Sequence, residues 1–366
     1  MINKPNTTED VLLDFEEFGQ NELSLRHAEG HSVAVDQTNV PPWNYAGKQL
    51  FPPFTYFGGK RDIAEEVWRR FGPDIPNYIE PFAGGLSVLL GRPIFDMRML
   101  DGKKCRELAN DANSFLLNFW RAIQNVDIRE IIKSVDFPAH ETELLGRREY
   151  MMEKHGELSR KIQNDKKKLD VCDPELAGYW LYIQREWIGA GADDPESFPF
   201  RKMIRAKEGG YLGESLEEHL HFLQLRTKHV RFFNDGWERP LISDTQSTNI
   251  GITGVFLDPP YMGSTDIYGG RLDNETLVDR DPLNAREWAL EKGKSPEFRI
   301  AYCGYLHQHD GFFPEGGDHG WVKKMWKFEG GYSKRLRNKE PRIETVWFSP
   351  GCIKPDGDPG SGWIKS

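Results

Sequence analysis

Residues 78–90 read Tyr-Ile-Glu-Pro-Phe-Ala-Gly-Gly-Leu-Ser-Val-Leu-Leu. The order of an apolar start, two glycines and a second apolar run predicts a strand, a turn and the start of a helix. Glycines at such a turn let a ligand approach the backbone, and the N-terminus of a helix offers free N–H groups. The spacing is not G-x-G-x-x-G, so a dinucleotide-binding fingerprint is not supported. The stretch therefore predicts one unit of an α/β fold with a ligand-binding turn.

A second strand is predicted at residues 107–110, and it ends in the acid Asp111. A helical pattern follows at residues 115–123. In a nucleotide-binding α/β unit, an acid at the end of the second strand can bind ribose hydroxyls. Helix capping is the alternative, because Asp111 and Asn113 both suit the N-terminus of a helix.

A buried strand is predicted by the apolar run at residues 254–257, which ends in Asp258-Pro259-Pro260-Tyr261. Both prolines have a fixed φ, so the carbonyls of Asp258 and Pro259 are held in place. Tyr261 can stack on a planar ring, while the carboxylate and a proline carbonyl accept both protons of an amino group on that ring. Fixed acceptors aimed at charge that develops on the nitrogen favour its attack on a methyl donor. An ordinary strand-to-turn junction is the alternative.

A third stretch, residues 54–61, opens a helix that runs through Trp68 and contains a Gly-Gly-Lys turn. Tyr56 can pack on a purine there, and Lys60 can meet a carboxylate. A lysine exposed to solvent is the alternative.

Together, these stretches resemble the Dam-type adenine-specific DNA methyltransferases, from about residue 48 to residue 352 with a gap in the middle. Residues 54–60 are similar to that family's first cofactor motif, with Phe57 in place of an alanine. Residues 80–88 are similar to its turn for S-adenosylmethionine, with Leu86 in place of the second glycine. Asp111 matches the ribose-binding acid, and residues 258–261 match the catalytic tetrapeptide without change.

The resemblance implies an α/β fold with a Rossmann-like methyltransferase sheet, mostly parallel with an antiparallel edge strand. It also implies methyl transfer from S-adenosylmethionine to the N6 amino group of an adenine flipped out of double-stranded DNA. The expected catalytic residues are Asp258, Pro259, Pro260 and Tyr261. The expected cofactor-binding residues are Tyr56, Gly58, Gly59, Lys60, Glu80, Pro81, Phe82, Gly84, Gly85, Asp111, Asp235 and Asp258. Among these, Asp235 is placed near the cofactor adenine by its position alone, and a turn cap is the alternative.

The length of 366 residues allows one large α/β domain with an inserted lobe, or two domains. We expect an N-terminal arm at 1–47, a catalytic domain at 48–126 and 226–353, an inserted helical target-recognition lobe at 127–225, and a C-terminal tail at 354–366. Further catalytic-domain strands are predicted at 230–235, 299–305, 320–328 and 343–348, with a helix at 284–292.

The chain has no apolar stretch of about eighteen residues and no signal-peptide pattern, so we expect a soluble, cytoplasmic protein. Its four cysteines are scattered without Cys-x-x-Cys spacing, which favours reduced thiols over disulfides or zinc. The group His307, His309, Asp310 and His319 has the residue types of a divalent metal site. Its glycine- and proline-rich surroundings favour polar contacts to DNA or a solvated loop, so no metal is expected.

The net charge of −9 argues against a polyanionic partner, but the distribution of charge matters more than the sum. Residues 322–342 hold eight Lys or Arg against two acids, with aromatic residues between them. We therefore expect this stretch to lie along DNA phosphates. The mixed charges of residues 147–168 are more typical of a solvated helix face. The aromatic residues at 178–187 are more typical of a core, although the family order places target recognition there.

The expected DNA contacts are Arg185, Arg201, Lys202, Arg205, Lys334, Arg335 and Arg337. Cytosine N4 methylation, or an RNA or protein-amide acceptor, is an alternative within the same chemistry. A methyltransferase-like module that binds DNA with little turnover is the alternative from another class, and Leu86 is the feature that favours it. A restriction endonuclease counterpart is a further expectation.

Overall fold

The computed structural model describes residues 50–54, 56, 58–93, 105–135, 140–164, 172–186, 216–244, 251–261, 281–316, 320–327, 343–358 and 360–364. The N-terminal arm predicted at 1–47 lies outside the described residues. Within the described part, no helix combines the length and the apolar character needed to cross a membrane.

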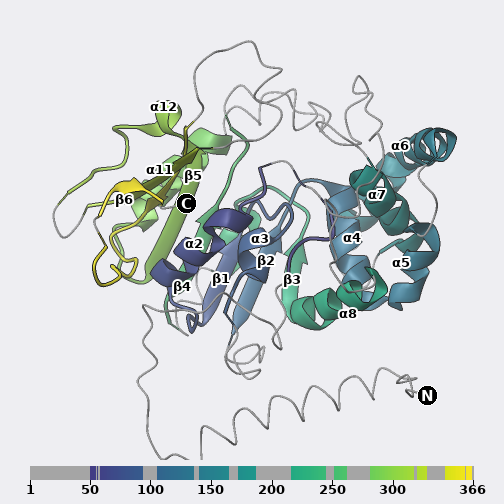
Figure 1. Cartoon of the computed structure of the whole chain (residues 1–366), viewed down its shortest axis with the longest axis horizontal. Coiled ribbons are helices and arrows are strands. Elements are labelled where there is room, and N and C mark those ends of the chain that lie inside the picture. The colour runs from purple at the N-terminus through teal and green to yellow at the C-terminus, as the bar shows by residue number, and fades with distance from the viewer. Residues whose placement is uncertain are drawn as a thin grey trace, which may run out of the picture.

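One sheet organises the described residues, with strand order β3-β2-β1-β4-β5-β7-β6-β8 (Figure 1). Its strands are β1 (Asn77–Glu80), β2 (Arg106–Asn110), β3 (Val230–Phe233), β4 (Thr253–Leu257), β5 (Phe298–Tyr305), β6 (Val322–Lys327), β7 (Ile343–Phe348) and β8 (Gly362–Trp363). Neighbouring strands pair in parallel from β3 to β5, whereas β7 runs antiparallel to both β5 and β6. The predicted mostly parallel, Rossmann-like sheet with an antiparallel edge is thereby confirmed, with β7 as the antiparallel strand between β5 and β6.

The carboxyl ends of the parallel strands meet at one edge of the sheet. The pairing places Asn110 beside Phe233 and Leu257 beside Tyr302, so the loops after β2, β3 and β4 leave from the same side. Strand β1 lies between β2 and β4, where the strand order reverses. In open α/β sheets, ligands bind at the carboxyl ends of the strands beside such a reversal.

Helices cover both faces of the sheet because the strand residues alternate between two cores. The ring of Tyr78 packs on Trp68 and Phe71, with ring centroids 4.7 and 6.2 Å apart. Its neighbour Ile79 belongs to a second core with Ala285. The helices are α2 (Ala64–Phe71) after the 3-10 turn η1 (Arg61–Ile63), α3 (Ser87–Leu90), α4 (Ser114–Asn125), α5 (Ile128–Val135), α6 (Glu141–Asn164), α7 (Pro174–Glu186), α8 (Leu216–Thr227), α9 (Arg239–Asp244), α11 (Asp281–Lys292) and α12 (Leu306–His309).

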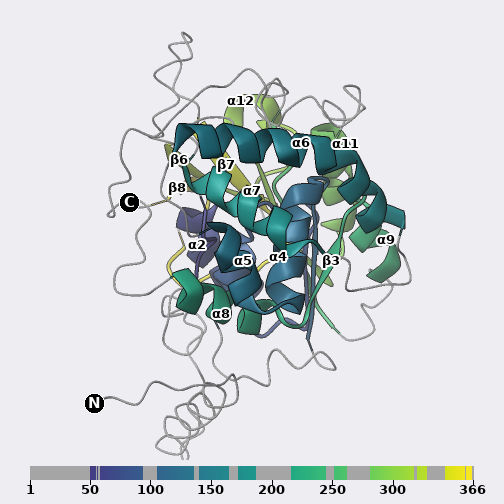
Figure 2. The same cartoon turned by 90° about the vertical axis from the view of Figure 1, so that its right-hand side faces the viewer.

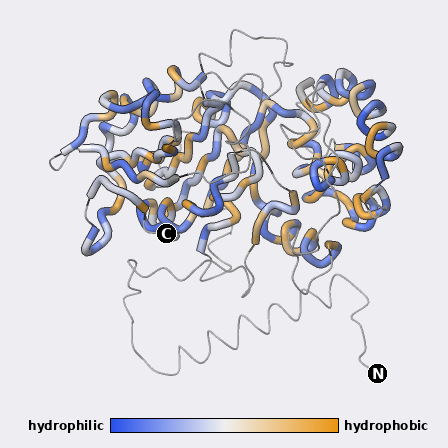
Figure 3. Tube along the Cα trace, turned by 45° about the horizontal axis from the view of Figure 1, so that its top comes forward, coloured by the Kyte–Doolittle hydropathy of each residue, from blue (hydrophilic) through white to orange (hydrophobic). Residues whose placement is uncertain are grey.

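Helices α4 to α8 gather beyond strand β3 and form a helical group at that end of the sheet (Figures 1 and 2). They alternate between hydrophilic and hydrophobic residues, as expected of helices that bury one side (Figure 3). The aromatic residues of α7 are core residues: Trp180 is fully buried, and its ring packs on Phe54 and Phe119 at 4.7 and 5.5 Å. This agrees with the interpretation of the stretch as core for residues 178–186, whereas Trp187 lies outside the described residues.

The described part of the C-terminal tail is fastened to the sheet. Strand β8 pairs with β6, and the Asp358 carboxylate accepts hydrogen bonds of 2.6 Å from both Arg70 and Lys324. The ion pairs join the tail to α2 and β6.

Candidate active site

Asp258 and Lys60 form an ion pair at the carboxyl end of β4. The five residues of β4 are all buried, and Asp258 follows the last of them with 18% of its side chain exposed. The Nζ atom of Lys60 lies 3.0 Å from Oδ2 of Asp258 and donates a 2.6 Å hydrogen bond to the Gly58 carbonyl. The Gly-Gly-Lys turn and the tetrapeptide, about 200 residues apart in the sequence, thus meet at one point.

Tyr261 lies beside this pair. Its ring centroid is 5.2 Å from the Lys60 Nζ atom and 4.4 Å from the ring of Tyr305, in an edge-to-face arrangement. Its hydroxyl donates a long hydrogen bond of 3.4 Å to Oε2 of Glu344, which is also 3.7 Å from the Lys60 Nζ atom. The sequence prediction missed Glu344, and the available signal was a lone acid in the apolar strand β7.

Burial raises the pKa of Asp258 to about 6, because the interior penalises the charged form. The Lys60 ammonium opposes this rise, and the Glu344 carboxylate adds to it. Asp258 is therefore mostly a carboxylate at neutral pH and becomes protonated as the pH falls through 6. In the charged form it can only accept hydrogen bonds, which is the property that an amino-group acceptor needs.

The turn after β1 has a strained backbone at Leu86. Among the described residues, Leu86 is the one non-glycine residue with positive φ, at φ 57° and ψ 24°. Its side chain is fully buried in the core. The Leu86 side chain therefore packs into the core beneath the turn and leaves the outer surface of the turn open. A positive φ is energetically costly for a residue with a Cβ atom.

The turn also brings Tyr56, Gly84 and Asp111 together. A Cβ atom on Gly84 would lie 3.1 Å from the ring of Tyr56, so the two residues are in close approach. The Gly84 N–H donates a 2.9 Å hydrogen bond to Oδ2 of Asp111, and Oδ1 of Asp111 accepts from the N–H of Asn113 at 2.8 Å. Asn113 is the residue that caps helix α4, because its Oδ1 accepts from the N–H groups of the first helical turn.

Asn110, at the end of β2, links the loops after β1 and β3. Its side-chain amide donates to the carbonyls of Pro81 and Asp235 and accepts from the Asp235 N–H. The carboxylate of Asp235 is exposed; it accepts from the N–H of Gly236 at 2.8 Å, as a turn cap does. Phe82 stacks on Trp237, with ring centroids 5.8 Å apart. Asn110 and Trp237 were not predicted as site residues.

The structure corrects the expected direct cofactor contact of Glu80. Its side chain is buried, and one carboxyl oxygen accepts hydrogen bonds of 2.6 Å from the Tyr78 hydroxyl and from the Leu89 N–H. Burial raises the pKa of Glu80 to about 8, so the acid is mostly protonated at neutral pH. Glu80 therefore holds helix α3 from the interior.

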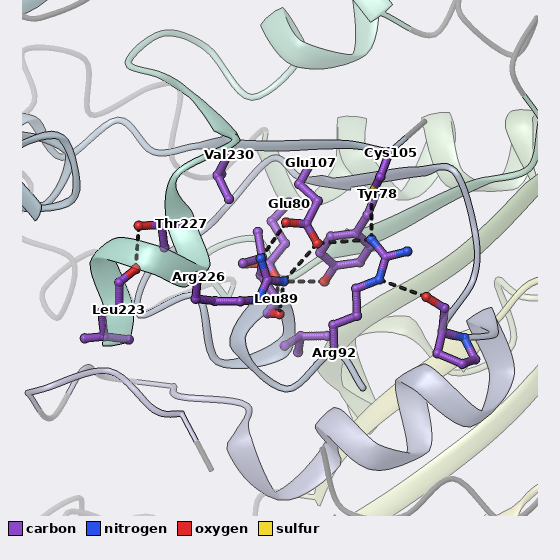
Figure 4. A network of polar contacts seen from close by, with 12 residues as sticks. Tyr78, Glu80, Leu89, Arg92, Cys105, Glu107, Leu223, Arg226, Thr227 and Val230 are labelled. Atoms are coloured by element: carbon purple, nitrogen blue, oxygen red, sulfur yellow. Dashed lines mark hydrogen bonds and ion pairs between the residues drawn. The ribbon is translucent and has the colours of Figure 1, made fainter. Parts of the chain in front are cut away.

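A buried ion network continues from this point (Figure 4). Glu107 on β2 accepts hydrogen bonds from Arg226 at 2.6 and 2.8 Å and from Arg92 at 3.0 Å. Arg226 also donates to the Leu89 carbonyl at 2.8 Å, and Arg92 donates to backbone carbonyls ahead of β1. Burial alone would raise the pKa of Glu107, but the two guanidinium groups hold it below its ordinary value. The network was not predicted from the sequence.

Most of the expected DNA contacts lie outside the described residues: Arg201, Lys202, Arg205, Lys334, Arg335 and Arg337. Arg185 is half-buried on α7. Two lysines of the basic stretch 322–342 are engaged within the protein. Lys323 lies 2.8 Å from carboxylates of Asp310 and Glu315, and the buried Lys324 binds Asp358. These two lysines are therefore engaged by acids of the protein itself, and a phosphate-binding role of the rest of the stretch stays a prediction.

His309 is a core residue. Its ring packs edge-to-face on Tyr302 and Trp347, and its Nδ1 is 3.4 Å from a nitrogen of Arg286. Burial and the neighbouring guanidinium lower the pKa of His309 to about 4. His319 lies outside the described part, within which no three His, Cys, Asp or Glu side chains are grouped closely enough to hold a metal ion.

Residues 56–188 match a family model described as D12 class N6 adenine-specific DNA methyltransferase. The matched range contains the Gly-Gly-Lys turn from Tyr56, the turn after β1, Asp111 and helices α4 to α7. Residues 258–261 lie beyond it. The comparison with curated proteins gave no match.

Proposed function

We propose that this protein is a D12 class N6 adenine-specific DNA methyltransferase, the family whose model residues 56–188 match, and that it moves the methyl group of S-adenosylmethionine to N6 of an adenine flipped out of duplex DNA. The observation that carries the proposal is the Lys60–Asp258 pair beside Tyr261. It stands where the strand order reverses, next to the turn that joins Gly84 to Asp111. An amino-group acceptor and a nucleotide-type turn thus share one edge of the sheet.

The geometry of the turn fits S-adenosylmethionine, which supplies an activated methyl group on a sulfonium. Asp111 lies where the loops after β1 and β2 meet, and each of its carboxylate oxygens accepts one backbone N–H. The second lone pair of each oxygen leaves Asp111 able to accept ribose hydroxyls while it keeps its backbone partners. Tyr56 offers an aromatic face next to Gly84, which has no side chain to stand in the way. Phe82 stacks on Trp237, and the backbone of Asp235 is bound by Asn110 at the end of β2.

For the acceptor base, Asp258 and the Pro259 carbonyl would take the two amino protons. Both acceptors are fixed before the base arrives, so they favour the state in which the nitrogen carries positive charge. The base must leave the duplex, because an amino group inside it cannot be aligned with the methyl donor. No thiol is needed as a nucleophile: Cys303 is fully buried beneath the site, and burial raises its pKa.

The buried position of Leu86 favours turnover over a binding-only module. A leucine at a glycine position would block the turn if its side chain pointed outward, but here it packs into the core. The adenine-specific description of the matched family also favours adenine N6 over the cytosine and RNA alternatives. The target-recognition role of residues 127–225, a cytoplasmic location and a restriction endonuclease counterpart stay predictions.

The direct test is to incubate the full chain with unmethylated duplex DNA and S-adenosylmethionine that carries a tritiated methyl group. The DNA is then digested to nucleosides. We expect label in N6-methyldeoxyadenosine. Label in N4-methyldeoxycytidine would replace the adenine assignment, and DNA without label would defeat the proposed activity.

Replacing Asp111 with alanine should weaken binding of S-adenosylmethionine by about 1.5–3 kcal/mol, or roughly ten- to a hundredfold, because charge-assisted hydrogen bonds to the ribose are lost. Calorimetric titration measures the dissociation constant. Asn113→Ala is the matched control, since it removes the cap of α4 two residues away without touching the proposed ribose site. Equal dissociation constants for the parent and the Asp111 variant would leave Asp111 with a purely structural role.

Changing Lys334, Arg335 and Arg337 together to glutamine should weaken binding to all DNA sequences about equally, because phosphates carry no direct sequence information. Each lost phosphate contact removes about 0.9 from the slope of log affinity against log salt, so the slope should change by roughly 2 to 3 units. Binding assays over a salt series resolve such a change. An unaltered slope would direct the search for the DNA surface to residues 147–205.

A further inference from the structure

Glu344 places a second carboxylate against the Lys60 ammonium. It stands on β7, between Tyr305 of β5 on one side and Trp326 of β6 on the other. Only 6% of its side chain is exposed. Its Oε2 atom is 3.7 Å from the Lys60 Nζ atom and 3.4 Å from the Tyr261 hydroxyl. The two strand neighbours fix its position from both sides, so the contact does not depend on a loose surface side chain.

Burying the Glu344 carboxylate costs free energy unless partner groups offset the lost hydration. A buried carboxylate loses hydration and needs charged or hydrogen-bonding partners. Lys60 and Tyr261 are such partners, and Asp258 uses the same lysine at 3.0 Å. One ammonium therefore bridges two carboxylates, one in the tetrapeptide and one on β7. The bridge ties the loop after β4 and the turn before η1 to the middle of the sheet.

We infer that Glu344 is a positioning residue of the methyl-transfer site, an inference that rests on the proposed function. It acts through Lys60, whose ammonium it holds in line with Asp258, and through the Tyr261 hydroxyl, whose ring it keeps against Tyr305. Glu344 does not touch the base or the methyl donor in this scheme.

The charges around Asp258 predict how the loss of Glu344 changes the pKa of Asp258. Lys60 favours the carboxylate form of Asp258, whereas Glu344 disfavours it through like-charge repulsion. From β5, Tyr302 and the thiol of Cys303 are neutral at working pH, because burial raises the pKa of both groups.

Two further side chains belong to this surrounding set. Tyr305 of β5 lies against Tyr261, and Lys324 of β6 is committed to Asp358 at 2.6 Å. Removing the charge of Glu344 should therefore make Asp258 easier to ionise, even as the site loses its alignment.

The experiment compares Glu344→Gln with Thr345→Val, a nearly isosteric change at the next residue, which is fully buried on the opposite face of β7. For each protein, kcat is measured from pH 5 to pH 8.5 at saturating cofactor and DNA, and the cofactor dissociation constant by calorimetry. Glu344→Gln should lower kcat at pH 8 by about tenfold or more, since misplacing a reacting group by about 1 Å can cost on the order of 10²-fold. The cofactor dissociation constant should stay close to that of the parent.

At low pH, kcat should fall as Asp258 becomes protonated. This acid limb of the pH profile should move to lower pH in Glu344→Gln, because the pKa of Asp258 falls, and stay in place in Thr345→Val. A loss of packing alone lowers the amount of folded enzyme but does not move the limb. A limb and a kcat equal to those of the parent would overturn the inference. If the parent itself labels no DNA, the proposed function fails instead, so the two failures are distinguishable.

Tyr261→Phe tests the same contact from its other side and covers the case in which Glu344→Gln does not fold. It removes the hydroxyl that donates to Glu344 and that also hydrogen-bonds Asp258, but keeps the ring. We expect kcat to fall by about two- to tenfold, the range that one ordinary hydrogen bond supplies. An unchanged kcat for Tyr261→Phe would count against a positioning role for Glu344.

Discussion

Replacing Asp258 with alanine is expected to lower the rate of methyl transfer by about 10²–10³-fold, because one fixed group that stabilises the charge of the transition state contributes a factor of this size. Binding of S-adenosylmethionine should change little, since the carboxylate acts on the amino group of the acceptor base. The measurement is single-turnover transfer of labelled methyl to DNA, paired with calorimetric titration of the cofactor.

The structure explains why this variant should still fold. The Lys60 ammonium loses Asp258 but keeps Glu344 at 3.7 Å and the Gly58 carbonyl at 2.6 Å, so it is not left alone in the interior. Asp258→Asn is the matched control, because its amide oxygen still accepts one hydrogen bond. We expect Asn to retain more activity than Ala. An alanine variant within about tenfold of the parent would remove Asp258 from the catalytic role, since that loss falls short of one transition-state acceptor.

The parts of the fold that were predictable are those with a local signal. The apolar run at residues 254–257 and the glycine pair at 84–85 each determine a strand end or a turn from a few neighbouring residues. The order of these signals along the chain then predicts the parallel half of the sheet. The same holds for Asp258 and Asp111, which follow directly after predicted strands and so fall at the carboxyl edge.

The side chains that were missed depend on pairings far apart in the sequence. Glu344 joins the site only because β7 runs antiparallel between β5 and β6, which sets it opposite Tyr305. Lys60 was expected to meet a carboxylate, but the identity of its two partners, Asp258 and Glu344, also depends on segments far apart in the sequence. Local patterns contain no information on such contacts, and a lone charged residue in a sequence is most often exposed. The inward position of Glu80 was missed for a different reason: its partner Tyr78 is only two residues away but was predicted only as a strand residue.

The second large effect is expected for the buried network around Glu107, on stability. Replacing Glu107 with glutamine should lower the free energy of unfolding by about 3–5 kcal/mol, because removing one partner of a buried ion pair leaves an uncompensated charge. Here two guanidinium groups, Arg92 and Arg226, lose their anion at once, and both are almost fully buried. The glutamine oxygen can still accept one hydrogen bond, which limits the decrease in the free energy of unfolding.

Urea unfolding followed by circular dichroism measures this change, with the midpoint expected to fall and the slope to stay constant. Glu130→Gln is the matched control: its 2.9 Å pair with Lys133 is exposed, and such pairs contribute only about 0–1 kcal/mol. The network also reaches the site, because Arg226 holds the Leu89 carbonyl while Glu80 holds the Leu89 N–H. A Glu107→Gln protein as stable as Glu130→Gln would mean that water or local relaxation solvates the two arginines. The turn after β1 would then be held by the Glu80 contacts alone.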